Sequence, residues 1–325
     1  MTDTPEWLPF EYDPAADRLT WLRMGEAGYR AASFLDQRIL TPASEQRQSG
    51  WPRQPADARR DAQYIFHIGN VGSTLISRLL GELPEVLALR EPLLLRSFAE
   101  LRPDRQRFDD LAALLSRTFR PEQRVNVKAT SFASEIADRL VRLGSKALFL
   151  YAAPDRYLEN ILAGQNSWQT LRALSPVRLA RLQERCPGAA LDLDRAHDGL
   201  KAALGWACEM TSLERAASAL PEDAVLWMDF DRFLADPAAG FATIASHFDL
   251  SPDPARAREI CEGPLMGRYS KALEYEYSPA LRREILADAR RRHASAIAEA
   301  MDWLGMVESR YPAAARAIRR PRGED

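Results

Sequence analysis

The chain has 325 residues, 46% hydrophobic and 28% charged, which is near the globular average and excludes a disordered chain. Its 44 basic and 46 acidic side chains give a formal net charge of −2. No whole-molecule field therefore draws it to nucleic acid or to an acidic membrane, and any anion site must be local.

The N-terminal stretch, residues 1–60, is rich in Pro, Arg, Gln and Ala, and its tryptophans, Trp7, Trp21 and Trp51, stand alone. We expect an irregular or partly helical lead-in whose function the sequence does not indicate. Its first fourteen residues carry acidic side chains without a basic or apolar stretch, and no later window holds about 18 uncharged apolar residues. The sequence therefore predicts a cytoplasmic protein.

Short apolar runs alternate with helical patterns from residue 64 onward. Strands are predicted at 64–68, 86–89, 124–128, 147–151 and 225–228, with apolar residues at helical spacing between them. This alternation is typical of a mainly parallel sheet with helices on both faces. We predict a single α/β domain over residues 61–306.

Two later segments are predicted to be helical. Residues 164–220 have several helical patterns and no convincing strand, which favours a helical insertion over the sheet. A long helical pattern follows at 279–306, and we expect residues 307–325 to form a basic C-terminal tail. The three cysteines, Cys186, Cys208 and Cys261, lack CxxC spacing and are interpreted as core thiols.

The segment His67-Ile-Gly-Asn-Val-Gly-Ser-Thr-Leu75, between the first of these strands and its helix, is the main candidate for chemistry. Glycines here let backbone N–H groups turn toward an anion, while two hydroxyls lie at the positive end of the helix dipole. The sequence therefore predicts an anion cradle formed by Gly69, Asn70, Val71, Gly72, Ser73 and Thr74. The alternative is a tight turn that needs glycine for backbone reasons alone.

The cradle departs from the P-loop nucleotidase signature GxxxxGK[ST]. With Gly72 as the second glycine, His67 stands at the first glycine position and Ser73 at the lysine position. The lysine that spans the β and γ phosphates is missing, and Asp229 is the one obvious strand-end carboxylate for magnesium. Kinase and ATPase chemistry are disfavoured, and no metal is expected.

Several blocks of the sequence resemble the bacterial sulfotransferase family. The run from Phe66 to Leu75, followed by Leu89-Arg-Glu-Pro92, resembles that family's phosphosulfate-binding loop and next strand. Residues 127–130 look like its lysine-bearing third strand, 149–154 like the strand that leads into the 3′-phosphate site, and 225–237 like its late strand and helix entry. The resemblance covers roughly residues 62–305 and implies a P-loop-type, sulfotransferase-like fold.

The resemblance implies transfer of a sulfuryl group from the co-substrate 3′-phosphoadenosine 5′-phosphosulfate to a hydroxyl or amine. The acceptor would be a small molecule or peptide of unknown identity, with no nucleic acid or membrane partner. Because the sulfuryl group carries less charge than a phosphoryl group, backbone donors can suffice and magnesium should be dispensable. The sequence does not indicate the oligomeric state.

Two sites depart from the family's pattern. Family members usually carry Arg or Lys where this chain has Asn70, and they grip the 3′-phosphate with an Arg-x-Pro and a later Ser where it has Ala152 and Asn160. A charge-assisted hydrogen bond is worth about 1.5–3 kcal/mol, so losing two or three would weaken donor binding by orders of magnitude. Either other cations compensate, or the ligand has changed.

The candidates for compensation are Arg90, Arg96, Lys128, Arg156, Arg268 and Lys271. Lys128 follows an apolar strand, and ligands of such sheets bind at the carboxyl ends of strands. Lys271 lies in a polar loop, much where the family has its late nucleotide-gripping loop. Arg156 also fits a solvated surface arginine.

Glu91 is the candidate general base, because a carboxylate at the end of the second strand could accept the proton of an acceptor hydroxyl. Its alternatives are a salt bridge to Arg90 or a helix cap. His67 lies inside a strand run and is interpreted as a core histidine. We predict catalytic roles for Glu91 and Lys128.

Three functions stay open: a phosphosulfate-dependent sulfotransferase with an unusual donor site, a P-loop transferase that uses another nucleotide, and a non-catalytic relative that binds a nucleotide or a protein partner. The replaced cations at Asn70 and Ala152 are what keep the second and third open.

Overall fold

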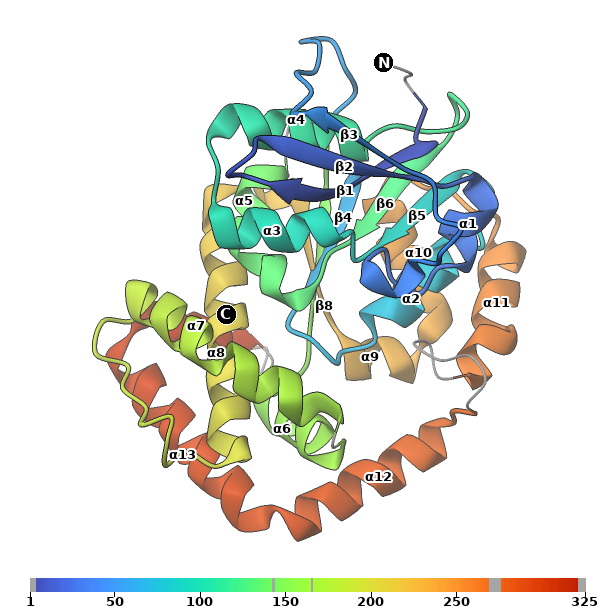
Figure 1. The fold of residues 1–325 in the computed structure, drawn as a ribbon. Coiled ribbons are helices and arrows are strands. Elements are labelled where there is room, and N and C mark those ends of the chain that lie inside the picture. Colours follow the sequence, from blue (N-terminus) through green and yellow to red (C-terminus); the bar gives the residue numbers. More distant parts are fainter. Residues whose placement is uncertain (1–3, 142–143, 165, 269–275, 321–325) are drawn as a thin grey trace.

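The centre of the molecule is a five-stranded, wholly parallel sheet (Figure 1). The computed structural model describes residues 4–141, 144–164, 166–268 and 276–320. The sheet order is β5-β6-β4-β7-β8, with strands β4 (Gln63–His67), β5 (Val86–Arg90), β6 (Arg124–Lys128), β7 (Ala147–Tyr151) and β8 (Val225–Asp229). All five predicted strands are present, each within one residue of its predicted bounds. The predicted α/β class is confirmed.

Helices cover both faces of this sheet. On one side Figure 1 places α2 (Ser73–Leu80), α10 (Pro237–His247) and α11 (Pro254–Glu262). On the other side lie α3 (Leu93–Leu101), α4 (Arg105–Leu115), α5 (Ala137–Leu140) and α8 (Asp198–Ala219). Right-handed crossover connections place the helices on these two faces when the strands follow this order.

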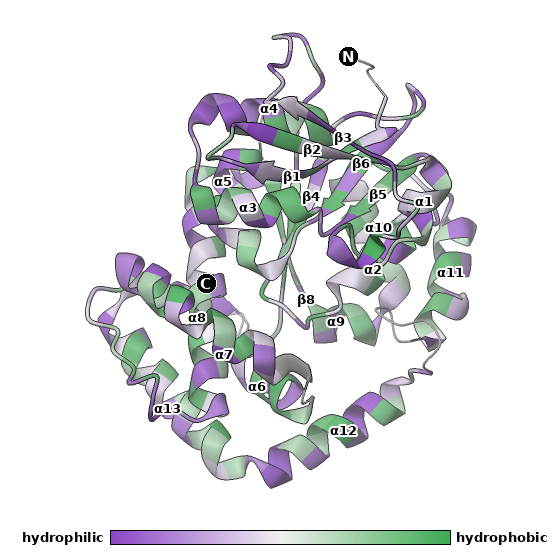
Figure 2. Ribbon diagram, viewed as in Figure 1, coloured by the Kyte–Doolittle hydropathy of each residue, from purple (hydrophilic) through white to green (hydrophobic). Residues whose placement is uncertain are grey.

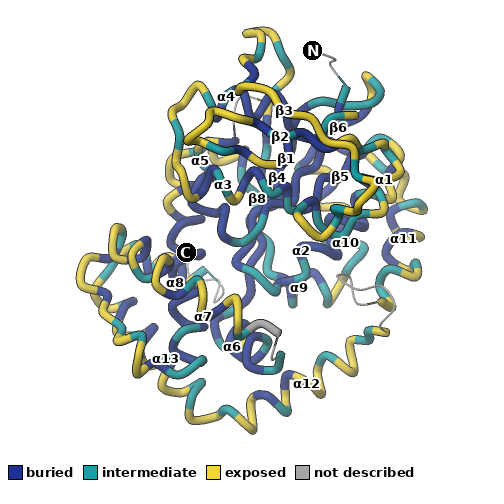
Figure 3. The backbone as a smooth tube through the Cα atoms, in the orientation of Figure 1, coloured by how far each residue is buried: buried dark blue, intermediate teal, exposed yellow. Residues whose placement is uncertain are grey.

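The remaining elements frame these layers. They are α1 (Glu26–Ala31), α6 (Pro154–Ala163), α7 (Asn166–Arg185), α9 (Phe230–Ala235), α12 (Pro279–Arg292), α13 (Ala294–Arg310), α14 (Pro312–Arg319) and the 3-10 turns η1 (Gln37–Ile39), η2 (Ser131–Ile136), η3 (Glu222–Ala224) and η4 (Pro264–Gly267). Apolar residues concentrate in the central strands and on the inner helix faces (Figure 2), and the same strands are the most buried part of the chain (Figure 3).

The strand order fixes where a ligand can bind. The chain leaves β4 toward β5 on one side, and it leaves β7 toward β8 on the other. Adjacent parallel strands whose connections run in opposite directions open a crevice at their carboxyl ends. The glycine loop after β4 lies at this point.

The N-terminal segment differs from its prediction. Instead of an irregular or partly helical lead-in, it forms an antiparallel sheet of β1 (Trp7–Asp13), β2 (Arg18–Arg23) and β3 (Gln46–Gly50), packed against α3. The alternating pattern is masked because β1 carries a register shift after Pro9 and β3 is polar and exposed along its whole length. The tryptophans are part of its packing, with the ring of Trp51 against Tyr12 and Phe98.

The C-terminal segment also differs from its prediction. The long helical pattern is two helices, α12 and α13, which meet at His293, and the expected basic tail contains α14. This helix buries Ala314, Ala317 and Ile318 against α8. The guanidinium of Arg320 pairs with Glu214 and lies 4.0 Å from the centroid of the Trp227 ring. The apolar face of α14 and the Arg320–Glu214 ion pair therefore hold this segment against α8.

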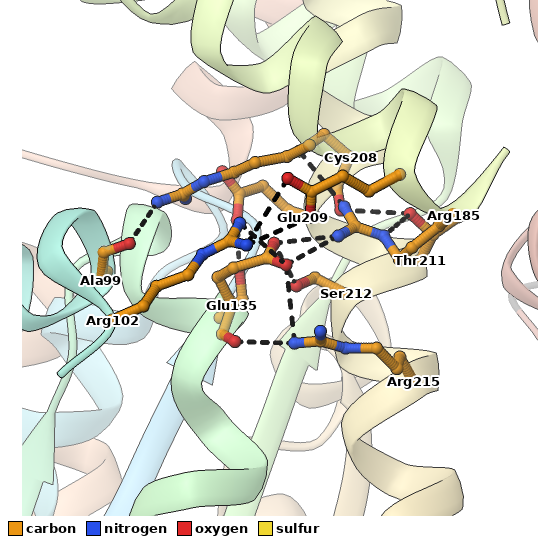
Figure 4. Close-up of polar contacts among 12 residues, drawn as sticks. Ala99, Arg102, Glu135, Arg185, Cys208, Glu209, Thr211, Ser212 and Arg215 are labelled. Carbon is orange, nitrogen blue, oxygen red and sulfur yellow. Dashed lines mark hydrogen bonds and ion pairs between the residues drawn. The ribbon is translucent and has the colours of Figure 1, made fainter. Parts of the chain in front are cut away.

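The helical insertion is confirmed as α7 and α8, and buried ion pairs join it to the layer below. Glu135 of η2 accepts from Arg185 of α7 at 2.8 and 3.0 Å and from Ser212 of α8 at 2.8 Å (Figure 4). Within the insertion, the side chain of Glu209 on α8 pairs with Arg178 of α7 at 3.0 Å, and it also accepts from Ser134 of η2. Because each carboxylate has at least one guanidinium in contact, these charges can stay buried.

The three cysteines are buried and unpaired, as predicted. None of the helices within the described ranges combines the length and apolar character needed to cross a membrane. In those same ranges, no three His, Cys, Asp or Glu side chains gather as a metal-binding group.

Candidate active site

A cavity of about 680 Å³ opens at the carboxyl edge of the sheet. Its floor is formed by the loop after β4 and by the ends of β5 and β6, and its walls come from α6, α7, α9 and α12. The described residues that line it include His67 to Leu75, Phe34, Arg38, Glu91, Lys128, Tyr157, Asn160, Arg178, Phe230, Arg268, Glu276, Leu281 and Arg282. All six predicted cradle residues lie on this one surface.

The backbone of the loop at 69–72 turns through left-handed conformations. The φ angles are +92° at Gly69, +53° at Asn70 and +71° at Gly72. Gly72 also has no room for a side chain, because a Cβ there would lie 2.0 Å from the ring of Phe230. Glycine at this position is therefore required by backbone angle and by the neighbouring ring together.

The loop leads into the N-terminus of α2, where the first backbone N–H groups have no acceptor within the helix. The first intrahelical bond runs from Ile76 N to Gly72 O at 3.1 Å, so the N–H groups of residues 72–75 have no helical acceptor. The hydroxyl of Thr74 is also buried without a hydrogen-bond partner. Donors at the positive end of a helix form a site for an anion.

Two side chains hold the loop in shape. His67 donates from Nε2 to Ala129 O at 2.8 Å and accepts at Nδ1 from Gly69 N at 3.0 Å. Both ring nitrogens are therefore engaged in structure, as expected of a core histidine. From α6, the amide of Asn160 donates to Asn70 O. Asn160 thus supports the loop from the side.

The two predicted catalytic residues are in contact. Lys128 Nζ, at the end of β6, forms an ion pair with Glu91 Oε1, at the end of β5, and Glu91 N donates to Lys128 O at 2.6 Å. The partner of Glu91 is therefore Lys128 rather than Arg90 or a helix end. Glu91 has φ +52°, an uncommon angle for a non-glycine residue. Burial lowers the pKa of Lys128, and the Glu91 carboxylate opposes this shift.

The N-terminal segment covers this pair. Leu35 N donates to Arg90 O at 2.7 Å and Leu93 N donates to Leu35 O at 2.9 Å, which ties the segment to the end of β5. Beside it, the Arg38 guanidinium carbon lies 3.5 Å from the centroid of the Phe34 ring, and Lys128 Nζ lies 5.8 Å from the same centroid. No local motif signals this role, because the contact joins residues far apart in the sequence.

The charges that line the cavity are mostly positive. Among the described lining residues, five are cationic, Arg38, Lys128, Arg178, Arg268 and Arg282, and two are carboxylates, Glu91 and Glu276. The partners of three cations, Asp36, Glu209 and Asp231, are outside the lining. Cations therefore outnumber carboxylates on the cavity surface, which favours an anionic ligand, and four of them, Arg38, Lys128, Arg178 and Arg282, also form ion pairs.

The other cations proposed from the sequence lie elsewhere. Arg90 donates to carbonyls at the end of α1, Arg96 pairs with Glu100, and Arg156 pairs with Glu159. Ala152, the position at which the sequence resemblance led us to look for a phosphate-binding arginine, is buried, and its carbonyl accepts from Trp206 Nε1 at 3.0 Å.

Two other residues singled out from the sequence are Lys271 and Asp229. Lys271 lies outside the described residues. Asp229, considered above as a magnesium ligand, accepts from Arg232 N at 3.0 Å and caps α9.

No protein-family model and no curated protein matches the chain. Among solved structures, it is similar to the sulfotransferase domain from the curacin biosynthetic pathway, at TM-score 0.43 and 14% identity, over 84% of this chain and 99% of that one. It is also similar to the sulfotransferase domain of the Synechococcus PCC 7002 olefin synthase, at TM-score 0.44 and 14% identity, over 74% and 91%. A sulfotransferase from Mycobacterium avium aligns at TM-score 0.40 and 13% identity, over 73% and 77%.

Proposed function

We propose that this chain transfers a sulfuryl group from 3′-phosphoadenosine 5′-phosphosulfate to a hydroxyl or amine. The observation that carries the proposal is the left-handed loop at Gly69–Gly72, which presents the N-terminus of α2 to a cavity whose charged lining residues are mainly cations. A loop of this kind binds the phosphate of a nucleotide. Ser73 stands where a nucleotidase would carry its lysine, which favours sulfuryl over phosphoryl transfer.

The positions of the family-like blocks support the proposal. Those at 66–75, 89–92, 127–130, 149–154 and 225–237 each contain the carboxyl end of a strand in the central sheet. Segments that lie up to about 160 residues apart thus converge on the edge where such sheets bind ligands.

The residues of the cavity fit a phosphosulfate. Its 5′-phosphate would accept from the N–H groups at the start of α2 and from the Thr74 hydroxyl. Lys128 pairs with Glu91, and Arg38 interacts electrostatically with it; these two cations would offset the negative charge that develops on the bridging oxygen, a role that Asn70 cannot fill.

In the proposed step the acceptor oxygen attacks sulfur and forms a new O–S bond. The bond from sulfur to the bridging oxygen breaks, and its electron pair leaves on the phosphate of 3′-phosphoadenosine 5′-phosphate. The acceptor proton passes to Glu91 and then to solvent. One carboxylate oxygen of Glu91 contacts Lys128, while the other makes no hydrogen bond in the described part of the chain. Such a positioned base contributes about 10²–10⁴ in rate.

A second candidate is transfer from a different nucleotide. It is favoured by the surroundings of Ala152, where the family's 3′-phosphate arginine is replaced by a buried small side chain beneath Trp206. Among the described lining residues, Arg178, Arg268 and Arg282 are the cations left to bind a second phosphate, and of these Arg178 pairs with Glu209 and Arg282 with Asp231.

Thermal unfolding with added nucleotides separates the two candidates. At about 100 times its dissociation constant, a ligand adds about 2.7 kcal/mol, which moves the midpoint by several degrees. We expect this shift with 3′-phosphoadenosine 5′-phosphate, unchanged by magnesium, and a smaller one with adenosine 5′-phosphate. A shift with ATP or GTP and none with 3′-phosphoadenosine 5′-phosphate would reject the sulfotransferase proposal in favour of the second candidate.

A threonine pair tests where the ligand binds. Thr74→Val removes the unpartnered hydroxyl at nearly constant volume, and we expect about tenfold weaker binding of 3′-phosphoadenosine 5′-phosphate, since one hydrogen bond to a charged group is lost. Thr243→Val, on the exposed face of α10, removes a hydroxyl bonded within its own helix and should leave binding unchanged. Equal effects of both substitutions would place the nucleotide elsewhere.

A further inference from the structure

Part of the cavity wall that faces away from the sheet is an aliphatic patch. It is formed by Ile161 of α6, Leu171 of α7 and three residues of α12, Leu281, Ile285 and Leu286. The cavity therefore combines backbone donors and charged side chains with a patch of aliphatic side chains on the surrounding helices, which also contribute the guanidinium groups of Arg178 and Arg282. A ligand that fills it must match both.

Two of these side chains are unusually exposed. Leu281 is 43% exposed and Ile285 is 45% exposed, and they lie one turn apart on α12. The helix is yellow along much of its length in Figure 3. Burying such aliphatic surface gains about 25 cal/mol per Å², so their exposure inside a cavity is a cost that a bound apolar group would remove.

The position of α12 is fixed by other residues. Leu286 and Ala289 are buried, and the helix packs against α6. At its C-terminal end the guanidinium of Arg290 pairs with Glu159 and Asp155 of α6. Leu281 and Ile285 are therefore not needed to attach the helix, and they present a wall that is already in place.

We propose that the acceptor is an alcohol with an alkyl or aryl body, which lies against α12, α6 and α7 with its hydroxyl at Glu91. The placement of the hydroxyl rests on the proposed function, whereas the apolar wall does not depend on it. A highly polar acceptor, such as a sugar or a charged peptide, would leave Leu281 and Ile285 in contact with water or with unsatisfied polar groups.

The test uses straight-chain alcohols as probes. Binding of 1-hexanol, 1-octanol and 1-decanol to the full chain is measured by calorimetry, with and without saturating 3′-phosphoadenosine 5′-phosphate. We expect affinity to rise about three- to fourfold for each added methylene, the value for transfer of that group from water to an apolar site. Equal affinity for the three alcohols would overturn the proposal.

Matched substitutions locate the binding. Leu281→Gln and Ile285→Gln replace an aliphatic group by an amide without lowering helix propensity, and each should weaken the binding of 1-octanol by about five- to tenfold. Leu101→Gln is the control, because Leu101 is 42% exposed at the end of α3 and is absent from the lining of the cavity. All three positions are at the surface, so folded variants are expected and are checked by circular dichroism.

The outcomes separate the two proposals. If Leu281→Gln and Ile285→Gln bind 1-octanol as the Leu101→Gln control does, the wall is not the acceptor site. If alcohols bind at the wall but 3′-phosphoadenosine 5′-phosphate gives no thermal shift, the sulfotransferase proposal fails while an apolar ligand site stands.

Discussion

At the scale of single residues, the contact between Glu91 and Lys128 concentrates charge and backbone strain in one place. The Lys128 side chain is 1% exposed, and Glu91 is held at positive φ so that its carboxylate reaches it. A non-glycine residue in this region costs of order 1–3 kcal/mol and persists only where its surroundings enforce it. Here the enforcing contacts are the ion pair and the bond from Glu91 N to Lys128 O.

We predict strong coupling between these two side chains in stability. Glu91→Gln leaves a buried ammonium without its counter-ion and should cost about 2–4 kcal/mol, discounted for the partial exposure of Glu91. Replacing both residues, as Glu91→Gln with Lys128→Met, removes the stranded charge and should recover most of that loss. Urea unfolding of the single and double variants measures the coupling. Additive effects of the two substitutions would show that the pair does not stabilise the fold.

At the scale of elements, the sequence predicts structure well where the pattern is regular. Four of the five central strands could be predicted because each contains at least three consecutive apolar residues, such as Ala147–Tyr151, and the fifth, Arg124–Lys128, because its valines alternate with polar residues. By contrast, Gln46–Gly50 is polar throughout, and it pairs with β2 through the backbone ladder and through polar contacts such as Ser49 Oγ, which accepts from the indole of Trp21 at 2.8 Å. The α14 helix was missed for a related reason, since its charged residues hide a stripe of alanines.

The candidate site divides in the same way. The loop at 69–74, Glu91 and Lys128 could be predicted because each directly follows a recognisable strand. Arg38, Arg178 and Arg282 lie in a turn and on helices with no local signature, and only the tertiary fold brings them to the cavity. The sequence therefore predicts the floor of the site but not its walls.

The attachment of the helical insertion is a second test of buried charge. Burial alone would raise the pKa of Glu135, but the guanidinium groups of Arg185 and Arg215 outweigh it and hold the pKa below the usual value. We predict that Glu135→Gln costs about 3–5 kcal/mol, because Arg185 loses its counter-ion in the interior (Figure 4). The control is Glu100→Gln, which breaks an exposed pair with Arg96 and should cost at most about 0.5 kcal/mol.

The sign of the pH dependence follows from the depressed pKa. The unfolded chain takes up a proton at Glu135 more readily than the folded chain, so this carboxylate stabilises the fold above its ordinary pKa of 4.5. The difference in urea midpoint between the wild-type chain and Glu135→Gln should therefore shrink as the pH falls below about 4.5. A constant difference down to pH 3 would mean that packing, rather than charge, is lost.

At the scale of the whole molecule, the net charge of the chain is negative, whereas the charge of the cavity lining is positive. The chain as a whole carries −2, whereas the cavity is lined by five cations and two carboxylates among its described residues. Interactions between exposed charges fall off over a Debye length, which is about 10 Å at 0.1 M salt. An anionic ligand is therefore attracted by the side chains of the cavity and not by the protein's overall charge.

A pair of arginines can separate these two effects. Arg38 and Arg96 are both about half exposed, each pairs with a nearby carboxylate, Asp36 or Glu100, and each lies near a phenylalanine ring. Arg38 lines the cavity and Arg96 does not. Replacing either arginine by glutamine changes the net charge equally, from −2 to −3. We predict that Arg38→Gln weakens the binding of 3′-phosphoadenosine 5′-phosphate about two- to fivefold at low salt, as expected for a partly exposed charge. Arg96→Gln should leave this binding unchanged.

Calorimetry at 0.05, 0.15 and 0.5 M NaCl completes this last experiment. Added salt should weaken nucleotide binding to the wild-type chain and to the Arg96→Gln variant by the same factor at each concentration. Binding to Arg38→Gln should depend less steeply on salt, because one screened interaction is already gone. The three proteins should converge at high salt. Equal losses in both variants would mean that the ligand senses net charge. No loss in Arg38→Gln would mean that the N-terminal segment covers Glu91 and Lys128 without contributing charge to the bound nucleotide.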